Sequence, residues 1–254
     1  MIQLTPADML TAKQMLTEGS PTFSHALAEG IIPGKIFADD PAYPRTALFQ
    51  TSSGIYYLAG TLPDTGGDKW LHYLNEQRNG GRFTVLSASE DWDAFLIGGL
   101  KEPLKQMKRT TFSFADERSN PREEIGVKIE MFHEADCKQS VHFSEKYADE
   151  YWGGTANFLK NSFGFKVLHE GRTVSECVAI FRSERFAEVD IATHADFRGK
   201  GFAVHCARAF ISYCKDHKLE PRWDCDLHNK ASIRLAEKLG FCPLKTYSLF
   251  VEKR

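Results

Sequence analysis

Two basic residues alternate with two glycines where the chain reads Arg198-Gly-Lys-Gly201. The apolar run at 185–194 before them predicts a β-strand, and the amphipathic spacing at 200–217 after them predicts an α-helix. Glycine lets a backbone approach a ligand closely, and the N–H groups of a first helical turn bind anions. Because Arg198 and Lys200 add positive charge, the segment predicts a site for the pyrophosphate of a cofactor.

Two other phosphate-binding patterns do not fit this segment. A dinucleotide-binding G-x-G-x-x-G would need a third glycine at position 204, which is a valine. A P-loop would need Gly-Lys followed by Ser or Thr, whereas Gly201 follows Lys200. The glycine turn therefore differs from both of these nucleotide-binding motifs.

A second motif follows after one more predicted strand, at 221–226. Asn229 is placed to cap the helix predicted at 229–239, or to donate its side chain to a ligand, and Ser232 lies one turn further on. Gly240 then ends the helix in the manner of a C′ glycine. The glycine loop and the capped helix are each common in proteins, but the two motifs together at this separation are not.

The paired motifs resemble the GNAT superfamily of N-acetyltransferases. The pyrophosphate loop of that family, Arg/Gln-x-x-Gly-x-Gly/Ala, is matched by Arg198, Gly201 and Ala203. Its second motif is an Asn, a small residue three positions later and a Gly-Phe at the helix end. The matching residues are Asn229, Ser232, Gly240 and Phe241. The likeness covers residues 125–254.

A narrower resemblance is carried by Trp223-Asp-Cys225 and by the run from Ala236 to Phe241. These residues are similar to the subgroup that contains the zwittermicin-type self-resistance acetyltransferases. This match does not separate modification of a drug from housekeeping metabolism.

The resemblance implies acetyl-CoA as cofactor and transfer of its acetyl group to a primary amine of a small molecule. In the family, the strand before the loop splays away from its neighbour and its backbone contacts the pantetheine arm. That strand corresponds to Val189–Thr193, and Asn229 would reach the pantetheine or 3′-phosphate side. The implied cofactor-binding residues are Ile191, Ala192, Thr193, Arg198, Gly199, Lys200, Gly201, Phe202, Ala203, Asn229 and Ser232.

Acetylation of an amine requires a neutral nucleophile, so a base is needed. Many members of the family carry a Glu at the position of Glu188, and Asp190 lies two residues further along the same strand face. Glu188 is the first candidate base, and Asp190 is expected to share that role or to bind a cationic substrate. The Tyr that usually serves as general acid is replaced by Ala236, and neither Tyr213 nor Tyr247 is singled out as its substitute.

Cys225 is an alternative nucleophile on the strand that faces the pocket, with Asp224 and Asp226 on either side of it. Adjacent carboxylates disfavour the thiolate that nucleophilic catalysis needs. Direct transfer to the amine is therefore the favoured route, and Cys225 is expected to belong to the core.

The fold class expected from the elements is α/β (α+β), in two domains. Residues 125–254 are expected to form the mixed, mostly antiparallel sheet flanked by helices that the resemblance implies. Residues 1–120 form an N-terminal α/β domain of unknown role, which a degenerate second copy of the same fold would explain. The charged, proline-containing stretch Asp116–Glu124 is the expected boundary.

The composition is that of an ordinary globular protein, with 42% hydrophobic and 26% charged residues. A net charge of -2 argues against nucleic-acid binding that is dominated by electrostatic attraction to phosphates. Neither a signal peptide nor an apolar run of about 20 residues is evident, so no membrane partner and a cytoplasmic location are expected. The six cysteines contain no C-x-x-C pair, and no metal site is expected.

Three readings of the function stay open at this point. The first is a small-molecule N-acetyltransferase. The second is a non-catalytic acyl-CoA-binding or regulatory module, suggested by Ala236 in place of the usual Tyr. The third is a tandem GNAT enzyme acting on a peptide or aminoacyl group. The identity of the acceptor amine is not readable, and a homodimer is a candidate assembly.

Overall fold

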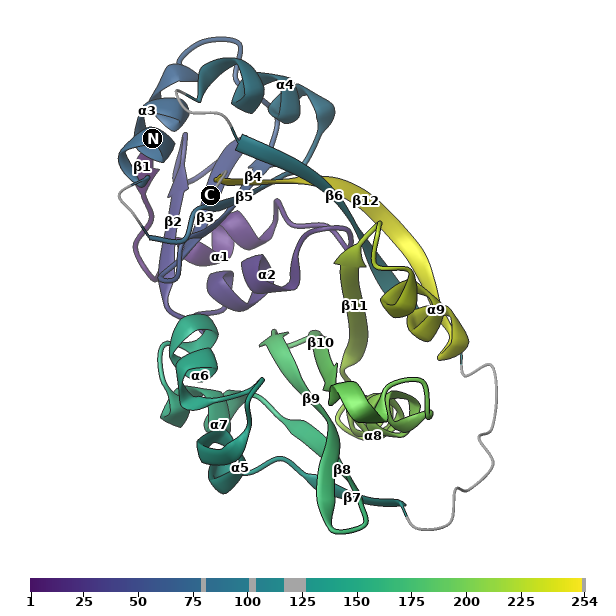
Figure 1. The fold of residues 1–254 in the computed structure, drawn as a ribbon. Coiled ribbons are helices and arrows are strands. Elements are labelled where there is room, and N and C mark those ends of the chain that lie inside the picture. Colours follow the sequence, from purple (N-terminus) through teal and green to yellow (C-terminus); the bar gives the residue numbers. More distant parts are fainter. Residues whose placement is uncertain (79–80, 101–103, 117–126, 253–254) are drawn as a thin grey trace. The chain divides into compact units, whose positions relative to one another are not determined.

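The computed structural model describes residues 1–78, 81–100, 104–116 and 127–252. The chain divides into two compact units: Met1–Thr110 together with Lys245–Arg254, and Thr111–Leu244. It passes from one unit to the other along two long strands, β6 (Leu104–Phe114) and β12 (Phe241–Glu252) (Figure 1). The last strand thus returns to the N-terminal unit, whereas the sequence analysis grouped it with residues 125–254. Residues 117–124 of the expected boundary, Asp116–Glu124, are outside the described residues.

The first unit contains a sheet covered by short helices. Its elements are β1 (Ile2–Gln3), α1 (Met9–Lys13), α2 (Thr22–Ala28), β2 (Gly34–Ala38), β3 (Thr46–Thr51), β4 (Ile55–Gly60), α3 (Asp68–Glu76), β5 (Thr84–Ser87) and α4 (Glu90–Gly99). The strands β1 to β4 pair in chain order and antiparallel, β4 pairs with β5 in parallel, and β5 pairs antiparallel with β12. Trp70, Trp92 and Leu58 are among the residues buried in its core.

The second unit holds the candidate site. Its elements are β7 (Val127–Met131), α5 (Glu134–Gln139), α6 (Glu145–Trp152), α7 (Thr155–Asn161), β8 (Gly164–His169), β9 (Arg172–Arg182), β10 (Phe186–Thr193), the 3-10 helix η1 (Ala195–Phe197), α8 (Phe202–Asp216), β11 (Glu220–Asp226) and α9 (Lys230–Lys238). The strands β7 to β10 pair in chain order and antiparallel, and β10 pairs with β11 in parallel. The expected α/β class, with a mixed and mostly antiparallel sheet flanked by helices, is confirmed.

The two units repeat one order of elements. Each begins with a strand and short helices, continues with three strands, and then alternates helix, strand and helix. In each, the fourth strand pairs in parallel with the fifth. This shared order favours the expectation that the N-terminal domain is a second copy of the same fold.

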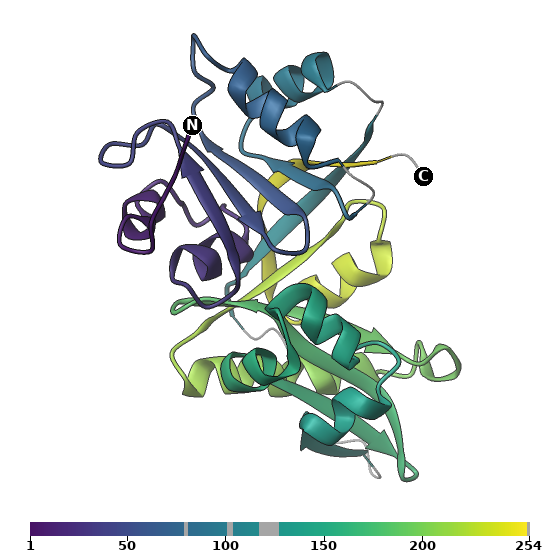
Figure 2. The ribbon, with the colours of Figure 1, turned by 90° about the vertical axis from the view of Figure 1, so that its left-hand side faces the viewer.

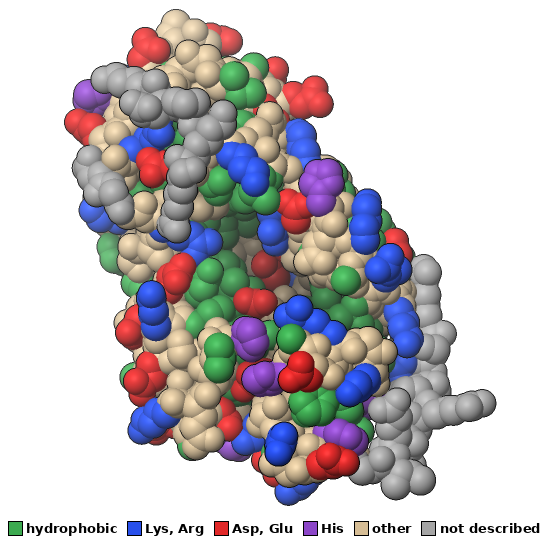
Figure 3. Space-filling model, viewed as in Figure 1, with side chains coloured by type: hydrophobic (Ala, Val, Ile, Leu, Met, Phe, Trp, Pro, Cys, Tyr) green, Lys and Arg blue, Asp and Glu red, His purple; other side chains and the backbone are tan. Residues whose placement is uncertain are grey.

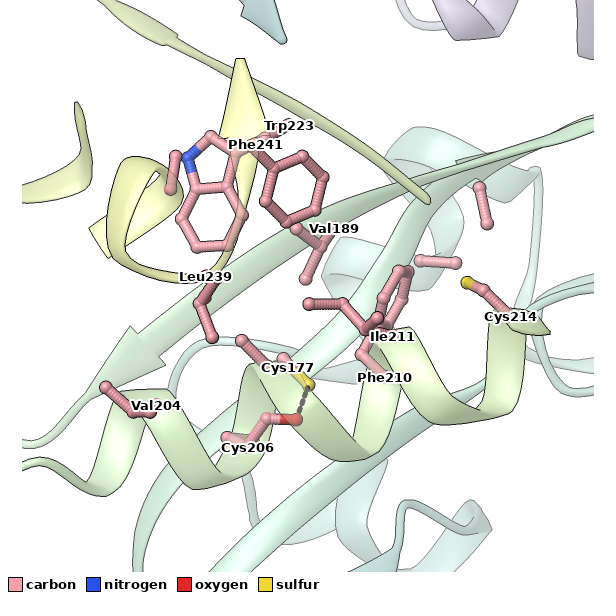
Figure 4. Close-up of a cluster of buried hydrophobic side chains, with 14 of the residues drawn as sticks. Cys177, Val189, Val204, Cys206, Phe210, Ile211, Cys214, Trp223, Leu239 and Phe241 are labelled. Atoms are coloured by element: carbon pink, nitrogen blue, oxygen red, sulfur yellow. Dashed lines mark hydrogen bonds between the residues drawn. The ribbon is translucent and has the colours of Figure 1, made fainter. Parts of the chain in front are cut away.

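The core of the second unit lies between α8 and the sheet. Figures 1 and 2 show α8 on one side of β8–β10 and α5 to α7 on the other. The buried face of α8 packs on Cys177 and Val189 from the sheet, with Trp223 and Phe241 nearby (Figure 4). The Cys177 thiol donates to the backbone oxygen of Cys206 at 3.4 Å. Such close packing fixes β9 and β10, which carry the candidate catalytic residues.

The helical stretch that covers one face of the second unit's sheet is interrupted after α5. Residues 140–144 separate α5 from α6, and α5 ends at its C-cap Ser140, whose backbone is extended at φ -67° and ψ 133°. The Ser140 hydroxyl accepts the N–H of Phe143 at 2.9 Å and donates to Glu176 at 2.9 Å. Because a serine side chain that bonds to nearby backbone competes with helical bonds, the helix ends there.

Candidate active site

The strands β10 and β11 pair over only a short stretch. Their register pairs are Phe186 with Glu220, Ala187 with Pro221 and Glu188 with Arg222. The pairing of β10 with β9 shifts between Glu188 and Val189, at the same place. Residues 189–193 therefore continue along β9 without a register partner on β11. Backbone groups at such a separation are available to a ligand rather than to the sheet.

The residues Ile191, Ala192 and Thr193 lie on this separated part of β10, and all are half-buried. They were expected to bind the cofactor through their backbone, and they occupy the end of the strand that leads into the loop. The hydroxyl of Thr193 lies 2.9 Å from that of Ser175 on β9, which holds the strand end to the sheet.

The loop after β10 is held by its own side chains. The Arg198 Nε donates to the backbone oxygen of Thr193 at 3.1 Å, and the Lys200 Nζ lies 5.0 Å from the centre of the Phe197 ring. Gly199 has φ +76° and Gly201 has φ +90°, a conformation that L side chains rarely adopt. Since a Cβ at Gly199 would meet no atom within 4 Å, the backbone conformation is what selects glycine there.

The helix α8 begins at Phe202 with an N-terminus suited to an anion. Gly201 caps it without a side-chain hydrogen bond, and its first turn contains no acidic residue. Arg198 and Lys200 are exposed just before it. The positive end of a helix dipole, exposed N–H groups and two cations together favour a phosphate group. The loop residues Arg198 to Ala203 thus have the donors and charges that a pyrophosphate requires.

Asn229 and Ser232 support the start of α9. The Asn229 Oδ1 accepts the Ser232 N–H at 3.1 Å, and the Ser232 hydroxyl accepts the Trp223 Nε1–H at 2.9 Å. Asn229 is therefore the helix cap that its position in the sequence predicted. Contact of either residue with the cofactor stays a prediction.

Glu188 and Asp190 lie on the face of β10 that α6 covers, because alternate residues of a strand share a face. The Tyr147 hydroxyl of α6 donates to the Asp190 Oδ2 at 3.0 Å. Burial raises the pKa of Tyr147 well above its usual value of 10.0, and the charge of Asp190 raises it further. Tyr147 is therefore a neutral hydrogen-bond donor at ordinary pH.

Tyr147 was not singled out by the sequence analysis. It belongs to a ladder of aromatic rings on this face, with centroid distances of 5.1 Å from Phe143 to Tyr147, 4.7 Å from Tyr147 to Tyr151 and 5.8 Å from Tyr151 to Phe181. The signal in the sequence was the spacing of four residues between Tyr147 and Tyr151, which places both side chains on one face of α6.

The candidate substitutes for the usual general acid are not favoured by their positions. Ala236, which stands in place of the family tyrosine, is completely buried. Tyr213 stacks on Phe163 at 4.2 Å and on His217 at 3.8 Å, along α8. Tyr247 belongs to the other compact unit. Cys225 is 4% exposed within the core, as expected for a residue of a packed strand.

A buried carboxylate lies beside β10 on the face of α5 and α6. Glu176 of β9 is 4% exposed, and its register partner is Ala192. Burial raises the pKa of Glu176, while the hydrogen bond from Ser140 and the imidazoles of His142 and His194 oppose that rise. In the part of the chain that the structure describes, no group of three or more His, Cys, Asp or Glu is arranged to hold a metal ion.

On the side seen in Figure 3, basic and acidic side chains are interspersed over each unit. No helix in the described ranges is both long and apolar enough to span a membrane.

Comparisons with known proteins bear on the whole chain. The family model described as GNAT acetyltransferase matches residues 13–250. The chain is 36% identical over 234 residues to an uncharacterized N-acetyltransferase of Bacillus subtilis (strain 168), YdfB, with 91% of this chain and 90% of that protein covered.

Solved structures show the same fold over nearly the full length. A GCN5-related N-acetyltransferase-like protein from Streptococcus suis has a TM-score of 0.73 and 21% identity, and 97% of this chain and 99% of that one are covered. A tandem GNAT protein from the clavulanic acid biosynthesis pathway has a TM-score of 0.64 and 12% identity, with 99% and 97% covered. Both likenesses concern the fold.

Proposed function

The chain belongs to the GNAT acetyltransferase family, and on that premise we propose that it is an acetyl-CoA-dependent enzyme that acetylates a primary amine of a small molecule. The observation that carries the proposal is the separation of β10 from β11 after Glu188, directly followed by the loop with Gly199 and Gly201 at positive φ. A single compact unit thus contains an opening in the sheet, an anion site and a carboxylate at the mouth of the opening.

The residues present fit the cofactor by their chemistry. The N-terminus of α8, whose cap Gly201 makes no side-chain hydrogen bond, suits a pyrophosphate together with Arg198 and Lys200. The backbone of Ile191 to Thr193, on the separated part of β10, suits an amide-containing arm. When bound, acetyl-CoA would supply an acetyl group activated as a thioester.

Glu188 is the proposed base. Its carboxylate would take a proton from the acceptor ammonium, so that the neutral amine can act as the nucleophile. The burial of Cys225 supports direct transfer to the amine over a route through an acylated cysteine. With Ala236 buried in place of the family tyrosine, the proton that the leaving thiolate needs is assigned to water.

Isothermal titration with acetyl-CoA and with CoA tests the cofactor site. We expect micromolar binding that Gly201→Val abolishes, because valine is strained at φ +90° and its side chain would cover the anion site. The matched control is Gly171→Val, at φ +75° in the turn between β8 and β9, where an added Cβ has open space. Absence of binding to the folded wild-type protein would overturn the proposal.

Turnover is measured as CoA release over a panel of primary amines. Release with at least one amine, and its loss in Glu188→Gln, is the expected result. Tight acetyl-CoA binding with no release from any amine would favour the non-catalytic acyl-CoA-binding or regulatory module instead.

A tandem GNAT enzyme acting on a peptide or aminoacyl group is the second candidate. The repeated order of elements in the two units favours it. The loop after β4 in the first unit, Thr61–Gly67, contains no Lys or Arg, so we place the acetyl-CoA site in the second unit alone. The zwittermicin-type subgroup, a cytoplasmic location and a homodimer stay predictions.

A further inference from the structure

The strand β7 forms an edge of the sheet in the second unit. Among the strands that the structure describes, it pairs with β8 and is the last in the sheet order. Figure 1 shows it beyond β8 at the margin of the strands β7 to β10. An edge strand presents backbone N–H and C=O groups with which another strand can pair. The side of β7 that faces away from β8 is therefore a place where the sheet can be extended.

The pairing with β8 shows which residues of β7 face this open side. The Phe132 N–H donates to the backbone oxygen of Gly164 at 2.8 Å, and this pair continues the register of β7 on β8. In an antiparallel ladder, residues that bond to the neighbouring strand alternate with residues whose backbone groups point the other way. The backbone groups of Val127, Ile129 and Met131 therefore point to the open side.

The side chains of β7 form an apolar face and a charged face. Ile129 is 44% exposed and Met131 is 38% exposed. On the opposite face, the Lys128 Nζ lies 2.7 Å from the Glu130 Oε1, and the Lys166 Nζ of β8 lies 3.4 Å from the Glu130 Oε2. The edge strand thus combines exposed apolar side chains with one lysine and one glutamate that are two residues apart.

This strand is complementary to itself about a twofold axis at Ile129. In an antiparallel pair centred there, Lys128 of each copy lies opposite Glu130 of the other, and Val127 lies opposite Met131. The three residues that face the open side then exchange backbone hydrogen bonds, and the charged pairs fall between them, where opposite side chains are closest. We propose that two copies of the chain associate through β7 in this register, which joins the sheets of their second units. The inference is independent of the proposed acetyl transfer.

The charges also select this register over its neighbours. An axis between two residues is excluded, because a residue that faces the open side would then oppose one that faces β8. An axis at Lys128 would place this lysine opposite its own copy, and an axis at Glu130 would do the same with the glutamate. Like charges directly opposite each other destabilise a strand pair. Opposite charges meet in the register centred on Ile129, where each Glu130 also keeps the lysine of its own strand.

The expected dimer is weak and depends on concentration. Each β7 contributes five residues, and a pairing of that length falls below the ~1,200 Å² at which standard interfaces begin. We expect mostly dimer at about 100 μM protein and monomer at about 1 μM, as measured by sedimentation velocity of the full chain. Ile129→Pro removes the N–H at the axis, which faces away from β8, so it should give a folded monomer at about 100 μM. Circular dichroism checks the fold.

The register is tested by reversing each charge. Lys128→Glu places glutamates opposite each other and Glu130→Lys places lysines opposite each other. Since the axis applies each change twice, either variant should raise the Kd about tenfold or more. An equal mixture of the two variants restores opposite charges at both positions, so it should form a heterodimer with a Kd within about threefold of wild type. Lys238→Glu and Glu237→Lys make the same charge changes at exposed positions of α9. These controls should keep the wild-type Kd, alone and mixed.

Three results would overturn the inference. The first is wild-type protein that is monomeric at about 100 μM, which would mean that a different chain, or none, pairs with β7. The second is a dimer whose Kd is unchanged by Ile129→Pro or by both charge reversals, which would place the interface on another surface. The third is an equal mixture of the two folded charge variants that stays monomeric, which would exclude the register centred on Ile129.

Discussion

Glu188 of β10 lies opposite Arg222 of β11 in the last register pair that these parallel strands form. The irregularity in the pairing of β10 with β9 falls directly after Glu188, so the strand changes its pairing on both sides at once. A carboxylate at this point lies at the start of the opening between the strands. This position is the structural reason to choose Glu188 over Asp190 as the base.

Glu188→Gln is expected to lower kcat/KM by about 10²- to 10³-fold, because it removes a general base while keeping the shape of the side chain. The Kd for acetyl-CoA should change less than about twofold, since the proposed cofactor contacts begin three residues later. Steady-state CoA release and titration measure the two quantities. The control is Glu237→Gln, an exposed residue of α9. Full activity of the Glu188→Gln enzyme would show that another group is the base.

The double variant Arg198→Ala/Lys200→Ala is expected to weaken acetyl-CoA binding about tenfold or more, because charge-assisted hydrogen bonds to phosphate contribute about 1.5–3 kcal/mol. Binding of S-acetylpantetheine, which has no pyrophosphate, should change little. The comparison of the two ligands by titration isolates the pyrophosphate contacts. Equal losses for both would mean that the loop has collapsed, since Arg198 also bonds to Thr193.

The local parts of the site could be predicted from the sequence. Gly199 and Gly201 stand at positions where the backbone needs positive φ, and Asn229 caps its helix through a bond to Ser232 three residues away. These features depend on neighbours in the chain, so residue types and spacing were enough to place them.

Contacts between distant residues could not be predicted. Tyr147 and Asp190 meet across 43 positions, and Ser140 bonds to Glu176 across 36. The second of these contacts lies at the end of α5, before α6 begins. The return of β12 to the first unit depends on pairing of residues 249–251 with residues 84–86, which is also non-local.

The substitution Ala236→Tyr introduces the tyrosine that the family usually has at this position. It is expected to destabilise the protein by about 1–3 kcal/mol and to give no gain in turnover. Ala236 is completely buried in the core of the second unit, so a larger side chain overpacks it. Urea unfolding of the variant measures the change. Glu237→Tyr, on the exposed side of the same helix, should unfold near the wild-type midpoint. A stable and more active Ala236→Tyr enzyme would show that the helix can turn this position toward the substrate.

Glu176→Gln is expected to change how stability depends on pH. Burial holds the pKa of Glu176 above its ordinary value of 4.5, so the folded state binds this proton more tightly than the unfolded chain does. Its contribution to stability is complete below about pH 4.5 and is lost as the pH rises through the folded-state pKa. Glutamine imitates the protonated form, so the variant should gain stability relative to wild type across that range.

Urea unfolding of both proteins at a series of pH values measures the difference. The exposed Glu170→Gln change is the control for replacing a carboxylate by an amide on the surface. His142, His194 and Ser140 favour the charged form of Glu176, whereas Asp136 opposes it. A stability difference that stays constant from pH 4 upward would therefore mean that these neighbours offset the burial of the carboxylate, so that Glu176 has the same pKa in the folded and unfolded states.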